Sequence, residues 1–266
     1  MQPDDFAPGT VWLVGAGPGD PEYLTMKAVR LIERADIVFY DALVGPEILN
    51  LIPAGTERVP VGKRSGRHSQ DQRTIDAMLV AAATADRRVV RLKGGDPSLF
   101  GRSNEEMEAL RTARCAVHVC PGVTAASAAA ASAGVSLSLR GVAREVRFVT
   151  AHSRRGAALD LDWHDLARAG ATLAFYMGRD AASEISRQLI ANGMPGGTPV
   201  LIACNVSLPH EMILSTRLDL LGLATRALAA TAPTLILVGE AVQAGSDRIG
   251  TTMRHATPIV GQSEPP

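Results

Sequence analysis

Short apolar runs alternate along the chain with longer segments in which apolar residues recur every three or four positions. The short runs are typical of buried strands and the longer period of amphipathic helices, so the pattern predicts an α/β fold. In the first half, strands are predicted at 11–14, 36–40, 88–92 and 116–120, and helices at 24–34, from Ser69 onward and at 103–114. Ser69 with Gln72, and Ser103 with Glu106, have the spacing of capping boxes.

The second half repeats the alternation with a different detail. Strands are predicted at 146–150, 172–177, 200–203 and 234–238, and helices at 180–192 and 217–230. A further strand at 211–215 would give this half some antiparallel character. The stretch 134–141 lacks a helical period, which divides the chain into α/β domains at 1–136 and 137–243, and residues 244–266 are expected to be a mobile tail.

Composition narrows the class of protein. The 266 residues are 46% hydrophobic and carry 27 basic against 27 acidic side chains, so a folded core is expected and a binder of nucleic acid or anionic membranes is not. No apolar run is long enough for a membrane span and residues 1–10 lack a signal-peptide pattern, which predicts a cytoplasmic protein. Three cysteines without a CxxC pair and six histidines without ligand spacing predict no metal.

Two glycine-rich turns follow predicted strands. The first, GAGPGD at 15–20, fails as a dinucleotide-binding fingerprint because Pro18 lacks an N–H donor and Asp20 would repel phosphate. The second, RLKGGDP at 91–97, lets a ligand approach the glycine backbone beside the charge of Asp96. That charge suits a ligand with a positive centre and hydroxyl groups, although either turn by itself also fits an ordinary connection between elements.

A dense basic loop, VGKRSGRH at 61–68, is either a solvated charge run or an anion-binding loop. It contains Lys63, one of only three lysines, and Arg64. Arg102 and Arg140 also stand next to motif positions. Because guanidinium groups bind carboxylates in a bidentate manner, these residues favour a polycarboxylate substrate.

The motifs together resemble the tetrapyrrole methylases, and among them the uroporphyrinogen-III C-methyltransferases. The resemblance rests on VGAGPGDPEYLT, ADIVFYDALV, VGKRSGRHSQDQ, VVRLKGGDPSLFGRSNEE, PGVTAAS and YMG, which occur in order from about Val11 to Gly239. It implies two α/β domains with S-adenosylmethionine in the cleft between them, no metal, and a homodimer. The implied reaction adds two methyl groups, at C2 and C7 of uroporphyrinogen III, to give precorrin-2 by way of precorrin-1, with S-adenosylhomocysteine as the other product.

The resemblance also implies roles for individual residues. Asp41 and Lys63 match the positions of proton acceptor and donor, and Arg102, Glu105 and Arg140 match positions linked to substrate binding or proton handling. Of these, Arg102 and Glu105 are grouped with the catalytic residues. Arg64 and Arg140 are expected to bind the substrate carboxylates. The positions that match cofactor contacts are Pro18, Gly94, Gly95, Asp96, Leu99, Thr124, Ala125, Met177 and Val206.

Three segments depart from the family pattern. Leu139 stands at a histidine position, Ala151 at a glycine position, and 205–218 replaces a glycine-containing turn followed by a QRV-like strand, with Val206 in place of a glycine. Two alternatives to the implied reaction therefore stay open: methylation of a later precorrin, and a non-catalytic paralogue that binds the cofactor or a tetrapyrrole. The start of the first motif at Val11 leads us to expect that oxidation and metal insertion downstream, towards sirohaem, cobalamin or haem d1, need a separate dehydrogenase and chelatase.

Overall fold

The computed structural model describes residues 5–62, 71–151, 159–229, 232–243 and 251–253. The chain divides into two compact units, Met1–Ala128 (unit 1) and Ala129–Pro266 (unit 2), and each is described by itself. The division lies within helix α5 (Ala125–Ala133), upstream of the predicted boundary at 134–141. The alanine-rich sequence of this helix has no break in its apolar pattern, so periodicity does not reveal a division inside it.

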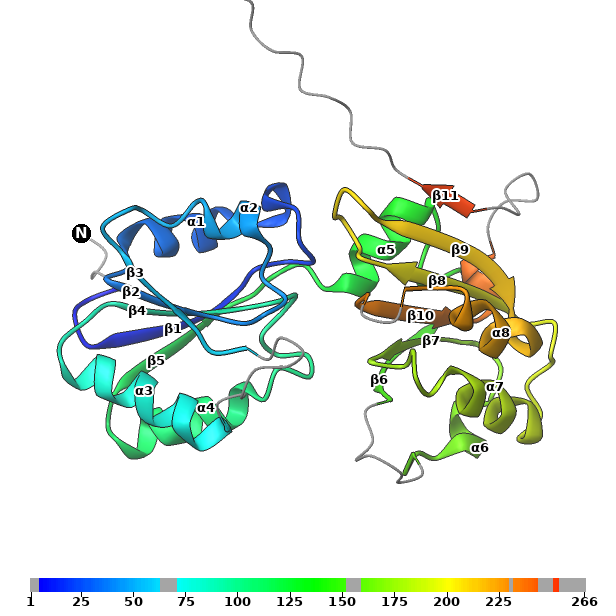
Figure 1. Cartoon of the computed structure of the whole chain (residues 1–266). Coiled ribbons are helices and arrows are strands. Elements are labelled where there is room, and N and C mark those ends of the chain that lie inside the picture. Colours follow the sequence, from blue (N-terminus) through cyan, green and yellow to red (C-terminus); the bar gives the residue numbers. More distant parts are fainter. Residues whose placement is uncertain (1–4, 63–70, 152–158, 230–231, 244–250, 254–266) are drawn as a thin grey trace, which may run out of the picture. The chain divides into compact units, whose positions relative to one another are not determined.

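Unit 1 contains a five-stranded, all-parallel sheet in the order β3-β2-β4-β1-β5. Helices cover both of its faces, with α1 and α2 on one and α3 and α4 on the other (Figure 1). The three central strands, β2, β4 and β1, are therefore buried, which explains their short continuous apolar runs, whereas the edge strands β3 and β5 are mostly exposed. The strands are β1 (Thr10–Gly15), β2 (Ile37–Tyr40), β3 (Glu57–Pro60), β4 (Val89–Lys93) and β5 (Ala116–Cys120), and the helices are α1 (Met26–Arg34), α2 (Pro46–Leu49), α3 (Gln72–Thr84) and α4 (Ser103–Thr112).

Successive residues of β4 belong to different layers. Val90 and Leu92 pack in the core under α1 and α2, whereas Val89 packs in the core under α3 and α4. Because side chains alternate along a strand, Arg91 and Lys93 point to the same face as Val89. The two charged residues are therefore directed under α4.

Both predicted capping boxes are wrong. Helix α3 begins after Asp71, whose carboxylate accepts a hydrogen bond from the backbone N–H of Thr74 at 2.7 Å, and Ser69 lies outside the described residues. Helix α4 begins after Arg102, and the Ser103 hydroxyl donates instead to the carbonyl of Pro97 at 2.5 Å. Glu106 is fully buried because its carboxylate pairs with two cations under the helix.

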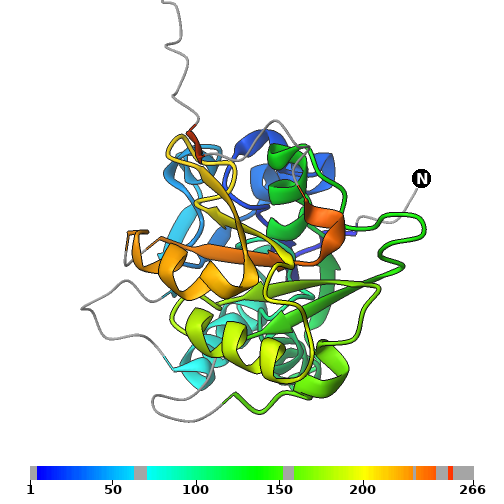
Figure 2. The ribbon, with the colours of Figure 1, turned by 90° about the vertical axis from the view of Figure 1, so that its right-hand side faces the viewer.

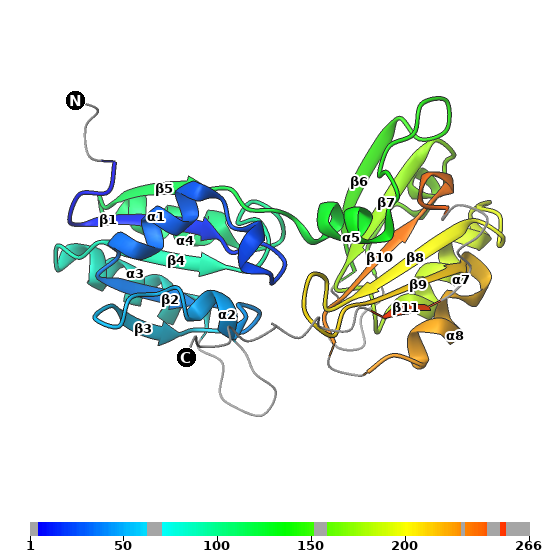
Figure 3. The ribbon, with the colours of Figure 1, turned by 90° about the horizontal axis from the view of Figure 1, so that it is seen from above.

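Unit 2 contains a six-stranded mixed sheet in the order β11-β9-β8-β10-β7-β6. Helices α6, α7 and α8 pack on one face, where they enclose the main core of the unit (Figures 2 and 3). The strands are β6 (Glu145–Thr150), β7 (Ala171–Tyr176), β8 (Pro199–Cys204), β9 (Met212–Arg217), β10 (Thr234–Val238) and β11 (Thr251–Met253), and the helices are α6 (Trp163–Leu166), α7 (Ala182–Ala191) and α8 (Leu221–Arg226).

The antiparallel character expected of this half is confirmed. Strand β9 pairs antiparallel with β8, and β10 pairs antiparallel with both β8 and β7. Within the segment predicted to be a mobile tail, Thr251–Met253 form β11 and pair with β9. In the part of the chain that the structure describes, no helix has the length and apolar character needed to cross a bilayer.

Candidate active site

The loops with predicted site residues in unit 1 lie at one edge of its sheet. They follow β1, β2, β4 and β5, and all four strands are parallel, so their carboxyl ends meet at the same edge. Open α/β sheets bind their ligands at this edge. It holds the GPGD turn, Asp41, the GGDP turn, and Thr124, whose hydroxyl accepts from the N–H of Ala126 at 3.4 Å where α5 begins.

Backbone contact between glycines joins three of these loops. Gly17 and Gly95 form a two-way bridge, with N–H to carbonyl distances of 3.1 and 2.7 Å. A Cβ on Gly15 would lie 2.5 Å from the nitrogen of Gly122, and a Cβ on Gly122 would overlap the carbonyl oxygen of Gly95. The closeness of the backbone segments therefore requires glycine at positions 15 and 122.

Asp96 fastens two of the loops together. Its Oδ2 accepts from the backbone N–H of Gly122 at 2.9 Å, and its Oδ1 accepts from the N–H of Ser98 at 2.7 Å and from the Ser98 hydroxyl. Much of the hydrogen-bonding capacity of this carboxylate is thus used within the protein. Asp96 shapes the backbone around Gly95, in addition to the charge that the sequence suggested.

Four charged side chains form a network beneath this edge, which we call the buried ion network: Asp41, Arg91, Lys93 and Glu106. Arg91 donates to Asp41 Oδ1 at 2.5 Å and to Glu106 Oε1 at 2.9 Å, and Lys93 donates to Glu106 Oε2 at 2.7 Å. The side chains of Arg91, Lys93 and Glu106 are at most 3% exposed, whereas that of Asp41 is 29% exposed. The network therefore presents one carboxylate, that of Asp41, towards the strand edge.

Burial and neighbouring charge act differently on the two cations. Burial opposes the charge of Arg91, but attraction to Asp41 and Glu106 outweighs it and raises the pKa of Arg91. Burial, together with repulsion from Arg91, lowers the pKa of Lys93, and Glu106 offsets part of that effect. Arg91 is consequently the permanent cation that orients Asp41.

Arg102 and Glu105 form a second, exposed pair at the start of α4. The guanidinium donates to both carboxylate oxygens of Glu105, at 2.7 and 2.6 Å, and this pairing lowers the pKa of Glu105. Arg102 has a φ of +54°, and Phe100 has a φ of +52°. A non-glycine residue in the left-handed region is strained, and such strain is concentrated at functional sites. The side chains of Arg102 and Glu105 are both exposed and accessible to a ligand.

In unit 2 the predicted residues also follow strand ends. Strands β7 and β8 run in the same direction, since both are antiparallel to β10, and Met177 and Asn205 directly follow them. Met177 has a φ of +56°, and Asn205 and Ser207 have values of +50° and +64°. Val206, between the last two, does not share this strain in the described chain, so the left-handed conformation that would exclude valine does not occur there.

Arg140 lies in a tight turn of unit 2. Leu139 and Ala143 exchange backbone hydrogen bonds of 2.9 and 2.8 Å, and Gly141 completes the turn with a φ of +80°. Both Leu139 and Arg140 are exposed. The turn thus presents an apolar side chain beside a guanidinium.

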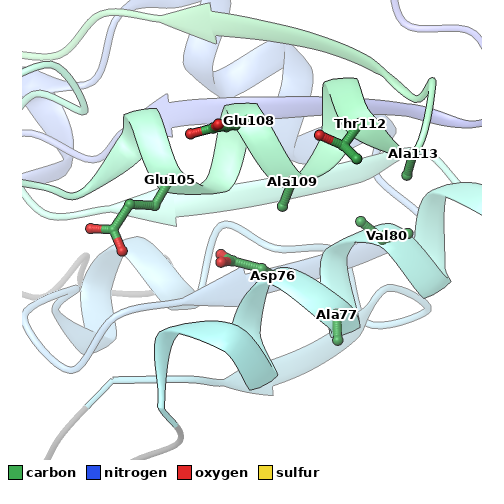
Figure 4. Close-up of a pocket in the computed structure, with 8 residues that line it drawn as sticks. All are labelled: Asp76, Ala77, Val80, Glu105, Glu108, Ala109, Thr112 and Ala113. Carbon is green, nitrogen blue, oxygen red and sulfur yellow. The ribbon is translucent and has the colours of Figure 1, made fainter.

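An open groove between α3 and α4 is a different feature from this site (Figure 4). Three carboxylates, those of Asp76, Glu105 and Glu108, line it together with small side chains. Of the predicted site residues it contains only Glu105, and its acidic lining would repel a polycarboxylate. We therefore do not assign substrate binding to this groove.

The structure places most of the predicted residues at strand ends of one unit or the other. Unit 1 holds Asp41, Pro18, Leu99 and the GGD turn, and Ala125 begins α5. Lys63 and Arg64 lie outside the described residues. Sequence reasoning missed the roles of Arg91, Lys93 and Glu106, although two charged residues inside the otherwise apolar run VVRLK were a usable signal. Metal-ligating side chains do not gather in groups of three or more among the residues described.

Comparison with known proteins gives consistent matches. Residues 10–221 match the family of tetrapyrrole (corrin/porphyrin) methylases. A uroporphyrinogen-III C-methyltransferase of Paracoccus denitrificans is 46% identical over 239 residues, which cover 90% of this chain and 83% of the relative. A siroheme synthase of Gluconacetobacter diazotrophicus is 45% identical over 88% of this chain, which spans about half of that longer protein.

Solved structures agree. A uroporphyrin-III C-methyltransferase from Thermus thermophilus, complexed with S-adenosylhomocysteine, superposes with a TM-score of 0.74 at 38% identity, covering 88% of this chain and 98% of that one. A cobalt precorrin-4 methyltransferase superposes with a TM-score of 0.79 at 27% identity, covering 88% of this chain and 96% of that one.

Proposed function

The chain belongs to the tetrapyrrole methylase family, and from this premise we propose that it is a uroporphyrinogen-III C-methyltransferase, which uses S-adenosylmethionine to form precorrin-2 by way of precorrin-1. The 46% identity to a relative of that name, over 90% of the chain, is the observation that carries the proposal. The departures at Leu139, Ala151 and Val206 leave the buried ion network and the glycine contacts intact.

The residues present fit the cofactor. A Cβ on Gly95 would meet no atom within 4 Å, so the backbone at Gly95 in the GGD turn faces open space, as close approach of a ligand requires. We assign cofactor contacts in unit 1 to Pro18, Leu99, Thr124, Ala125 and the GGD turn. In unit 2 we assign them to Met177, which is 49% exposed, and to the backbone of Val206.

The cofactor supplies an electrophilic methyl group, and the protein supplies position and proton handling. The main demand on the chain is to hold an electron-rich pyrrole carbon in line with that methyl group. After transfer, a proton must leave the tetrapyrrole. We assign its acceptance to the Asp41 carboxylate, which Arg91 holds at the edge of the sheet. We assign to Lys63 the donation of a proton at another position of the substrate. Arg102 and Glu105, which pair at the start of α4, are assigned to assist this proton handling.

The test of this function is anaerobic incubation with uroporphyrinogen III and S-adenosylmethionine, followed by mass spectrometry. We expect the product to gain two methyl groups and two molecules of S-adenosylhomocysteine to form for each molecule of uroporphyrinogen III converted. A protein that binds S-adenosylhomocysteine but methylates only a later precorrin would support the first alternative. Binding without transfer to either substrate would support a non-catalytic paralogue.

Arg140 is expected to bind a substrate carboxylate. Replacing Arg140 by leucine removes a charge-assisted hydrogen bond of about 1.5–3 kcal/mol, so the apparent affinity for the porphyrinogen should fall about 10- to 100-fold. Steady-state kinetics and S-adenosylhomocysteine calorimetry measure this, and cofactor affinity should not change. Arg144→Leu is the matched control, because Arg144 is also exposed and lies close by in the sequence. Equal loss in both variants, or loss of cofactor binding, would contradict the assignment.

We further propose a homodimer located in the cytoplasm. Leu139, Val142 and Phe148 of unit 2 are each 38–45% exposed although they are large and apolar, which supports an interface there. Light scattering after size-exclusion chromatography gives the mass in solution. A monomer at micromolar concentration would contradict this part of the proposal.

A further inference from the structure

Glu211 is a buried carboxylic acid that the proposed mechanism does not use. The residue is 4% exposed, and its Oε1 accepts no hydrogen bond from any group in the described parts of the chain. Its backbone is satisfied locally, since its N–H donates to the carbonyl of Leu208 at 2.9 Å. A buried carboxylate oxygen without a donor is costly, and native proteins retain few such groups without a reason.

The position of Glu211 associates it with the cofactor segment of unit 2. It immediately precedes β9, next to the pair formed by Met212 and Cys204 at the end of β8. Met212 and Leu214 pack against the core under α6, α7 and α8. Side chains alternate along a strand, so Ile213 is directed to the face opposite that of Met212 and Leu214, and Glu211 lies directly before the first residue of β9. The loop that Glu211 closes also contains Val206.

The chemistry of a carboxylate restricts what it can bind. When ionised it only accepts hydrogen bonds, so its partner must be an N–H or O–H donor, and a positively charged ligand is favoured. S-adenosylmethionine fits on both counts, because it carries an adenine amino group, two ribose hydroxyls and an ammonium group beside its sulfonium.

We propose that the carboxylate of Glu211 accepts a hydrogen bond from an amino or hydroxyl group of the bound cofactor, one that S-adenosylmethionine and S-adenosylhomocysteine share. This inference rests on the proposed function, because it places the contact in the loop to which we assign cofactor binding. It adds a side-chain contact to a segment where the assignment involved only the backbone of Val206.

The inference predicts that substitution of Glu211 weakens cofactor binding without lowering the stability of the unliganded protein. If Glu211 serves the ligand, Glu211→Leu removes an unpaired acceptor from the interior and should leave the melting temperature of the unliganded protein unchanged or higher. The same variant should bind S-adenosylhomocysteine about 10- to 100-fold more weakly, the range for a lost charge-assisted hydrogen bond. Glu211→Gln keeps an acceptor oxygen and should lose less affinity, which provides a second variant if the leucine protein does not fold.

Thr172 offers a matched control. Its hydroxyl oxygen is also buried without a partner among the described groups, and it lies near the start of β7, away from the end where Met177 follows that strand. Thr172→Val keeps the shape of the side chain and should leave S-adenosylhomocysteine affinity as in the wild type. Any change should be confined to the melting temperature.

The experiment combines calorimetric titration of S-adenosylhomocysteine with thermal denaturation for the wild type, Glu211→Leu, Glu211→Gln and Thr172→Val. Weaker binding in the Glu211 variants at an unchanged or higher melting temperature supports the inference. Wild-type affinity in Glu211→Leu, or in Glu211→Gln if the leucine protein is unfolded, overturns it and leaves the proposed function intact. Melting temperatures that fall in both Glu211 variants without weaker binding identify a structural carboxyl and also overturn it. A wild-type protein that does not bind S-adenosylhomocysteine overturns the proposed function, and this inference with it.

Discussion

Replacing Gly122 by alanine is expected to destabilise the protein by more than about 3 kcal/mol and to abolish S-adenosylhomocysteine binding. A methyl group at this position would overlap the carbonyl oxygen of Gly95 and lie 2.8 Å from the Cα of Gly15. Both neighbours are backbone atoms, so no side chain can rotate away, and the loops after β1, β4 and β5 must separate. Urea unfolding and calorimetric titration measure the two effects.

Gly95→Ala is the matched control for this prediction. Its φ of +68° makes alanine strained by about 1–2 kcal/mol, but a methyl group there meets no atom within 4 Å. The variant should therefore fold while losing cofactor affinity, because the methyl group occupies the space assigned to the ligand. If Gly122→Ala were as stable as Gly95→Ala, the contact between the three loops would not be as tight in solution as the structure has it.

The apolar content of each segment determined which elements could be predicted from the sequence. The strands at 36–40, 116–120 and 234–238 were predicted to within a residue, because their apolar runs are bounded by polar or turn residues. Strand β5 (116–120) was found although three of its residues are exposed, because AVHVC is still mostly apolar, whereas β3 was missed because ERVP holds two charged residues and a proline and has no apolar pattern. Helices α2 and α6 have four residues each, too few to show a period.

Tertiary charge pairing explains why the predicted cap of α4 was wrong. The spacing of Ser103 and Glu106 is that of a capping box, and local sequence alone favours it. Two buried cations on β4 compete for the same carboxylate, and two short ion pairs outweigh one hydrogen bond to a backbone N–H. Nine residues separate the strand from the helix that form this network, so local spacing could not reveal it.

The candidate site was predictable as motifs but not as contacts. The resemblance identified the glycine turns, Asp41 and Met177, since each stands in a distinctive run of residues. It did not show that Gly15, Gly95 and Gly122 touch, because these positions lie at or just after the ends of three different strands. Nor did it identify Glu211, whose significance depends on burial, which spacing along the chain does not report.

Glu106→Gln is expected to destabilise the protein by about 3–5 kcal/mol at pH 7, the usual cost of removing one partner from a buried ion pair. The substitution leaves Arg91 and Lys93 buried with Asp41 as the one remaining carboxylate of the buried ion network. It should also lower methyl transfer, since Arg91 would lose one of the two groups that hold it against Asp41. Urea unfolding at several pH values and the mass-spectrometric assay measure these losses.

The pH dependence of the free energy of unfolding tests whether Lys93 contributes to the destabilisation caused by Glu106→Gln. Burial and Arg91 already lower the pKa of Lys93, and without Glu106 it falls further, while the unfolded lysine keeps its ordinary value of 10.5. Between the two pKa values the unfolded chain binds more protons, so the stability of the variant rises as pH rises through that window. The loss of stability caused by Glu106→Gln should therefore become smaller between pH 7 and pH 10.

Glu105→Gln is the control, because it breaks only the exposed pair with Arg102. It should cost less than about 1 kcal/mol, and this loss of stability should not become smaller between pH 7 and pH 10. A loss in Glu106→Gln that is equal at both pH values would show that Lys93 does not contribute to it.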